Sequence, residues 1–139
     1  MVIRMKILRA LAVVFALVLF VPSCKDMGSE PAGSSPPPLP PAGATVSFRK
    51  DVLPICDNAG CTGCHGGTSG LILGSVTGLL AGGLHGPAII PGKPDSSNIV
   101  RKISPNPPFG VRMPEGGPYL DAAAIQTIKD WIAQGAKDN

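Results

Sequence analysis

An uninterrupted apolar run opens the chain and predicts an exported protein. Residues 10–21 are twelve apolar positions, ALAVVFALVLFV, and Arg4, Lys6 and Arg9 precede them without any acidic side chain. Such a run is too short to cross a hydrocarbon core of about 30 Å, but it matches the hydrophobic region of a signal peptide. We therefore interpret residues 1–23 as an export leader.

Apolar residues at the spacing of an α-helix occur at the two ends of the segment 45–139. Near its start, residues 48–56 place four apolar side chains on one rough face, Ser47 is suited to cap a helix, and Pro54 limits the regularity of that helix. The last helix is predicted more clearly, by apolar side chains at three- and four-residue spacing between a capping aspartate and a terminating glycine. The residues of this pattern are Asp121, Ile125, Ile128, Trp131, Ile132 and Gly135.

Between these helices the chain is rich in glycine and proline. In SPNPPFGVRMPEGGP, residues 104–118, five prolines forbid a continuous helix. The whole segment 45–139 holds 95 residues and few aromatic side chains, so it has little material for a hydrophobic core. A small domain of this kind usually needs a staple such as a metal ion, a disulfide or a large apolar cofactor.

The residues after the apolar run add a membrane attachment point. Val21, Pro22, Ser23 and Cys24 resemble a bacterial lipobox, in which a small residue precedes a cysteine that is lipidated and becomes the mature N-terminus. We expect lipidation at Cys24. The alternative is an ordinary signal peptide with an unrelated cysteine nearby.

A flexible tether follows this cysteine. Residues 24–44 contain six prolines and three glycines with almost no large apolar side chain, so they cannot form a packed core. In a polyproline II conformation, at about 3.1 Å per residue, they would reach roughly 60 Å. We divide the chain into the leader 1–23, the tether 24–44 and the domain 45–139.

The charge of the chain gives no indication of a nucleic-acid partner. Three of the twelve Lys and Arg residues lie in the leader, and the other nine are balanced by nine Asp and Glu residues. The exported part is therefore formally neutral. Its charge does not indicate nucleic-acid binding, and we expect none.

The chemically versatile side chains are concentrated in ICDNAGCTGCHGG, residues 55–67. Cys56, Cys61 and Cys64 have the first spacings of a plant-type iron–sulfur ligand run, but no further cysteine follows to complete it. A zinc site using both Cys64 and His65 is awkward because adjacent side chains point in different directions. Two disulfides would need the fourth cysteine of the chain, which the lipobox already claims.

The spacing Cys61-x-x-Cys64-His65 fits covalent haem attachment. Two thiols at this spacing can add to the two vinyl groups of one porphyrin as the chain crosses its edge. The imidazole of His65 then lies beneath the ring and ligates the iron. Export agrees with this interpretation, since c-type haem is attached outside the bacterial inner membrane. We predict one covalent haem c as the cofactor.

Residues 45–137 resemble a small single-haem cytochrome c module of the planctomycete type. The resemblance rests on the order FRKDVLPI, CTGCHGG, GPAIIPGKPDSSNIVRKI, RMP and IKDWIAQGA. It implies an all-α cytochrome c fold, with short helices and long Gly/Pro-rich loops wrapped around one haem. It also implies electron transfer, so we do not expect an enzyme.

Two features depart from the pattern of this family. Many cytochromes c have a proline soon after the haem motif, whose carbonyl holds the histidine, but here the next proline is Pro87. The carbonyl that orients His65 is therefore not identified. Cys56 has no place in the motif, and we expect a buried free thiol in the first helix; an intermolecular disulfide or an exposed, oxidation-prone thiol is the alternative.

Met113 is the predicted sixth ligand of the iron. It lies 48 residues after His65 on a proline-stiffened loop, and the resemblance places the distal ligand at the same position. His85 is the alternative, although its glycine neighbours favour a mobile surface loop. Lys93 and Lys102 are weaker candidates.

These features favour a lipid-anchored electron carrier facing the periplasm or the cell exterior. Iron with two protein ligands keeps no position for a substrate, so single-electron exchange with transiently docked redox proteins is the expected activity of a monomer. Its partners would be a membrane quinol-oxidising complex, a terminal oxidase or another exported oxidoreductase. The alternatives are a five-coordinate haem enzyme or gas sensor, and a structural module that haem merely staples.

Overall fold

The computed structural model describes residues 39–41 and 43–139. The predicted leader, Cys24 and most of the tether lie outside these residues, so their assignments stay predictions. The described part is helical, and its only β-type pairings are two isolated bridges. The expected all-α class is confirmed. None of the helices described here is long and apolar enough to cross a membrane.

The first helical segment changes its type at a proline. Ser47 caps it as predicted, because its side chain accepts a hydrogen bond from the Lys50 N–H. The π-helical turn η1 (Phe48–Val52) comes first, and the α-helix α2 (Leu53–Asn58) follows. Pro54 has no N–H, and in an α-helix its ring would collide with the carbonyl four residues earlier, so a wider turn precedes it.

The last helix, α6 (Ala122–Ala133), forms where its spacing predicts it. At its N-terminus the side chain of Asp121 accepts a hydrogen bond from the Ala124 N–H at 2.7 Å. At its C-terminus Gly135 adopts a φ of 99°, and the N–H of the following residue returns to the Trp131 carbonyl at 2.9 Å. This left-handed cap satisfies carbonyls of the last turn and ends the helix.

Three short helices and two 3₁₀ turns lie in the glycine- and proline-rich middle of the domain. They are α3 (Cys61–Cys64), η2 (Thr68–Gly70), α4 (Val76–Ala81), η3 (Pro94–Ser96) and α5 (Asn98–Ile103). Each is too short to show a clear apolar period in the sequence. The segment 104–118 contains no helix, as its prolines predict.

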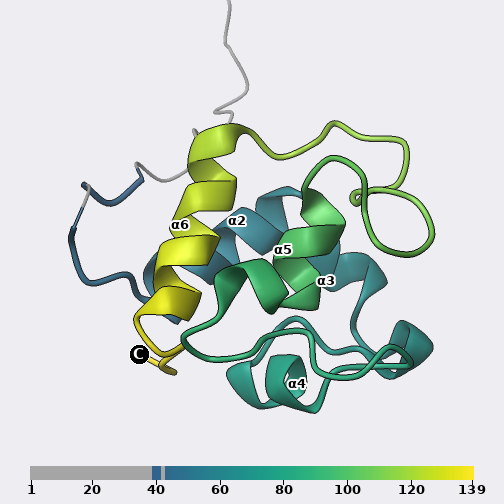
Figure 1. Ribbon diagram of the computed structural model, residues 1–139, viewed down its shortest axis with the longest axis horizontal. Helices are drawn as coiled ribbons and strands as arrows, with labels where there is room; N and C mark the ends of the chain where they lie inside the picture. Colours follow the sequence, from purple (N-terminus) through teal and green to yellow (C-terminus); the bar gives the residue numbers. More distant parts are fainter. Residues whose placement is uncertain (1–38, 42) are drawn as a thin grey trace, which may run out of the picture. The chain divides into compact units, whose positions relative to one another are not determined.

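The hydrophobic core joins the two end helices to α5. Figure 1 shows α6 running beside α5 and the first helical segment, while α4 lies lower in the view. Trp131 of α6 is fully buried, with its ring centroid 5.2 Å from that of Phe48, and its Nε1 donates to the Lys137 carbonyl at 2.9 Å. Ile128 and Ile132 are buried beside it. The predicted apolar face of α6 is therefore its core face.

The start of the first helix is also tied to the chain beyond α6. Ser47 Oγ and the N–H of Arg49 donate to the Asn139 carbonyl, at 2.5 and 3.1 Å, and the Phe48 N–H donates to the Asn139 side chain at 3.0 Å. These hydrogen bonds join the first helical turn of the domain to its C-terminal residue.

Candidate functional site

Cys61, Cys64 and His65 lie on one short helix and the turn that ends it. The preceding helix stops at Asn58, and Gly60 takes a φ of 72°, a conformation that glycine adopts without strain. Helix α3 then starts at Cys61 and holds both cysteines one turn apart on neighbouring positions of its surface. Cys61 is half-buried against the core, whereas Cys64 is exposed.

The backbone of His65 is held on both sides. Its N–H donates to the Cys61 carbonyl at 2.8 Å, and its own carbonyl accepts from the Leu73 N–H at 3.0 Å. The imidazole Nδ1 is buried and has no hydrogen-bond partner in the part of the chain that the structure describes. No described carbonyl therefore takes the orienting role that the sequence left open. Leaving a buried nitrogen without a partner costs about 1–3 kcal/mol.

Cys56, in α2, contacts the motif. Its side chain is 2% exposed and its thiol is free, which confirms the expected buried thiol of the first helix. Asp57 and Thr62 directly follow Cys56 and Cys61 in the chain, and Thr62 Oγ1 donates to Asp57 Oδ1 at 2.5 Å. Interaction with the Cys61 side chain, together with burial, raises the pKa of Cys56 well above its usual value. Interaction with the Cys56 side chain lowers the pKa of Cys61.

The loop that carries Met113 is fastened to α5. The Met113 N–H donates to the Lys102 carbonyl at 2.9 Å, and Arg112 Nε donates to the carbonyl of the last α5 residue at 2.8 Å. The Lys102 ammonium group donates to the carbonyls of Phe109, at 2.7 Å, and Val111. The Met113 side chain is half-buried and packs against the core. Hydrogen bonds from one helix therefore position this helix-free loop.

The other candidate ligands have different surroundings. His85 lies at the surface, as expected, but its ring stacks on Phe109 with centroids 4.0 Å apart, and its carbonyl accepts from the Asn98 side chain at 3.0 Å. Lys102 is engaged by the loop carbonyls, and Lys93 is exposed. The sequence showed no sign of the His85–Phe109 stack, because the two residues lie on separate loops.

Comparison with protein families identifies the segment that contains the motif. Residues 61–116 match the family model of planctomycete cytochrome C. This part of the chain is a planctomycete-type cytochrome c domain. Its limits include the two motif cysteines, His65 and the Met113 loop. Searches of the curated proteins and of the solved structures found no match.

Cytochrome c domains are typically exported and carry electrons through covalently bound haem c, and the residues of this domain fit that cofactor. In the described part of the chain, the thiols of Cys61 and Cys64 are free, and His65 follows them directly, which is the residue order of covalent haem attachment. Two exposed apolar side chains, Leu84 (82% exposed) and Ile72 (46% exposed), lie close to the motif along the hydrogen-bonded backbone. The Leu84 N–H donates to the Ser69 carbonyl at 3.2 Å, and Ile72 directly precedes Leu73, whose N–H donates to the His65 carbonyl. Thiols, a nitrogen ligand and exposed apolar side chains are the surroundings that a porphyrin uses.

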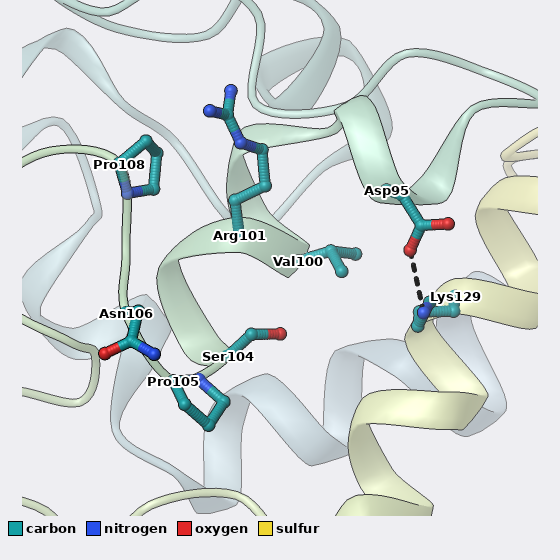
Figure 2. Close-up of a pocket in the computed structure, with 8 residues that line it drawn as sticks. All are labelled: Asp95, Val100, Arg101, Ser104, Pro105, Asn106, Pro108 and Lys129. Atoms are coloured by element: carbon teal, nitrogen blue, oxygen red, sulfur yellow. Dashed lines mark ion pairs between the residues drawn. The ribbon is translucent and has the colours of Figure 1, made fainter.

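A separate surface pocket of about 260 Å³ contains none of the motif residues. Figure 2 shows that it lies between α5, the turn after it and α6, with Asp95 paired to Lys129 at 2.8 Å and Arg101 pointing away from that pair. Its charged lining differs from the apolar surroundings of a haem. No three His, Cys, Asp or Glu side chains gather as a metal-binding group within residues 39–41 and 43–139.

Proposed function

We propose that the cytochrome c domain is a single-electron carrier whose haem iron is ligated by His65 and Met113. The thiols of Cys61 and Cys64 would hold the porphyrin covalently. When bound, haem c supplies reversible exchange between Fe(III) and Fe(II). With a protein side chain on each face of the iron no position remains for a substrate, which favours a carrier over an enzyme.

The attachment of the Met113 loop to α5 carries this proposal. A thioether is a neutral, weak ligand, so the backbone around it must hold it in place. Met113 and Arg112 each bond to carbonyls at the end of α5, and Lys102 reaches back to two carbonyls of the same loop. The side chain of His85 is not held in this way, since it is exposed and its ring stacks on Phe109. Methionine ligation favours Fe(II) and raises the potential relative to two histidines.

The Met113→Ala variant tests the ligand assignment. It keeps the backbone N–H that bonds to Lys102, so the loop should stay in place while the thioether is lost. We expect haem to remain covalently attached, the methionine–iron charge-transfer band to disappear and the redox potential to fall. The reduced variant should also bind carbon monoxide rapidly, whereas the unchanged protein should not.

The matched control is His85→Ala, which should keep the charge-transfer band and the potential. The ligand assignment is wrong if Met113→Ala keeps both while His85→Ala loses its sixth ligand. An unchanged protein that shows no reversible one-electron wave would contradict the carrier function itself.

The carrier is further proposed to be anchored through a lipid on Cys24, with the proline-rich tether separating the membrane from the domain. A diacylglyceryl group with an added N-acyl chain binds far more stably than one chain alone. Mass spectrometry of the mature N-terminus checks this, and a mature chain that begins after Cys24 would contradict it. Because the exported part is formally neutral, docking to redox partners should be transient and only modestly dependent on salt.

A further inference from the structure

We propose that Lys102 is a positioning residue for the Met113 ligand. Its ammonium group holds the stretch of loop before Met113 and so limits how often the thioether leaves the iron. This inference rests on the proposed ligation by Met113, and it assigns the control of that ligation to one side chain of α5. Lys102 does not bind the iron itself in this arrangement.

Lys102 contacts the Met113 loop through both its backbone and its side chain. Its carbonyl accepts from the Met113 N–H at 2.9 Å. Its ammonium group donates to the carbonyl of Phe109, at 2.7 Å, and to that of Val111. The same group lies 4.8 Å from the centroid of the Phe109 ring, which is a cation–π contact. One helix residue therefore fixes the loop at three alternate positions, of which the last is the ligand.

Gly110 allows two carbonyls to reach one nitrogen. In an extended strand the carbonyls of residues i and i+2 lie about 7 Å apart, which is too far for both to bond the same ammonium group. The chain therefore turns between Phe109 and Val111. Gly110 has a φ of 55°, a left-handed conformation that glycine adopts without strain. The turn suits a lysine in particular, because its nitrogen carries three donors on a single atom.

A second cation makes the attachment reciprocal. Lys102 lies in the last turn of α5 and donates to carbonyls of the loop, whereas Arg112 lies in the loop and donates through Nε to the carbonyl of Ile103 at 2.8 Å. Lys102 is half-buried, so solvent screens its bonds less than those of a surface lysine. A movement that carries Met113 away from α5 would have to break charge-assisted hydrogen bonds on both sides.

The ammonium group should therefore change the balance between attached and detached thioether. A neutral, weak ligand stays bound only if its loop returns it to the same place. A net hydrogen bond to a charged group is worth roughly a factor of ten in an equilibrium. Removing the Lys102 donors should raise the detached fraction by about that factor or more, while the Met113 side chain itself stays unchanged.

Titration of the oxidised, haem-attached full chain with free imidazole tests this. Imidazole can ligate the iron only when the thioether has left, so its apparent affinity reports the detached fraction. We expect Lys102→Leu to raise this affinity about tenfold or more and to weaken the methionine–iron charge-transfer band. Leucine keeps an apolar stem and adds no ligand or donor. Lys102→Gln keeps one neutral donor group and should give a smaller rise.

The matched control is Arg101→Leu, which removes the same charge from the same turn of α5. The Arg101 side chain is exposed and lines the pocket of Figure 2, and in the described structure it donates to no carbonyl of the Met113 loop. Its imidazole affinity should stay unchanged. Exchange of the Met113 amide hydrogen in the reduced protein gives a readout that needs no methionine–iron bond. It should become faster in Lys102→Leu but not in Arg101→Leu.

The possible results separate this inference from the proposed function. Unchanged imidazole affinity in Lys102→Leu, together with loss of the charge-transfer band in Met113→Ala, would overturn the role of Lys102 and leave the carrier function standing. Equal rises in Lys102→Leu and Arg101→Leu would also overturn it, because charge and not contact would then be responsible. A charge-transfer band that persists in Met113→Ala would overturn the ligation and the role of Lys102 together.

Discussion

Two regions of the domain differ in how completely the polypeptide satisfies its own side chains. The helical frame, made of η1, α2 and α6, has side-chain caps at the starts of η1 and α6, a fully buried Trp131 and hydrogen bonds that tie its first turn to Asn139. The site region, residues 61–86 and 104–118, has a buried His65 nitrogen with no partner among the described residues and leaves Leu84 82% exposed. The apolar side chains of the frame are therefore better covered by the polypeptide than Leu84 of the site region.

The exposed Leu84 marks where a bound cofactor would add apolar contacts to the domain. The family match covers residues 61–116, which include α5 and all of the site region except its last two residues. Frame residues need only be apolar at the right spacing, and many side chains meet that need. The site region must supply two thiols and a nitrogen ligand at fixed positions, and far fewer residue types meet this requirement than meet that of the apolar frame positions.

The largest expected effect comes from breaking the frame. Replacing Trp131 by Ala removes a fully buried ring that packs on Phe48 and should cost about 3–5 kcal/mol of the free energy of unfolding. Urea unfolding of the haem-attached chain measures this loss. Tyr119→Ala is the matched control, because this ring is 50% exposed and its contact with Arg112 should contribute less than about 1 kcal/mol. Equal losses in the two variants would show that the frame does not carry the stability.

An intermediate effect is expected from the turn of the site region. Gly82 and Gly86 have φ values of 72° and 82°, but a Cβ on Gly82 would lie 2.0 Å from the Gly86 carbonyl oxygen, while one on Gly86 meets nothing within 4 Å. Gly86→Ala should therefore cost only the strain of a left-handed alanine, about 1–2 kcal/mol. Gly82→Ala must also open the turn and should cost about 3 kcal/mol or more. Thermal unfolding of both variants checks the order, and similar losses would mean that the close approach of the two backbones is unimportant.

The smallest effect is expected from an ion pair on the surface of the frame. Arg49 lies 3.0 Å from Asp138, with side chains 68% and 49% exposed. Solvent screens such a pair, so Arg49→Ala should change the free energy of unfolding by less than about 1 kcal/mol, and by less still at high salt. A double-mutant cycle with Asp138→Ala isolates the pair. A coupling energy of several kcal/mol between Arg49 and Asp138 would contradict this prediction, because it would mean that ion pairs contribute as much as packing to the stability of the frame.

The sequence by itself determined the features whose signals are local. The capping residues Ser47 and Asp121 and the apolar face of α6 could be predicted because a helix repeats its contacts every three or four residues. The haem motif Cys61-x-x-Cys64-His65 was recognisable because its chemistry depends on neighbours in one short segment. The family match confirms the cytochrome c assignment, whereas ligation by Met113 and lipidation of Cys24 stay predictions.

Only the tertiary structure decided which side chains meet across turns and loops. The hydrogen bond of Thr62 with Asp57 depends on the reversal at Gly60, and the engagement of Lys102 with the Met113 loop depends on how that loop folds back on α5. Neither has a fixed sequence spacing, because a turn or loop can join the same residues along many paths. Packing and hydrogen bonding select one path, and they do so only when the whole domain has formed.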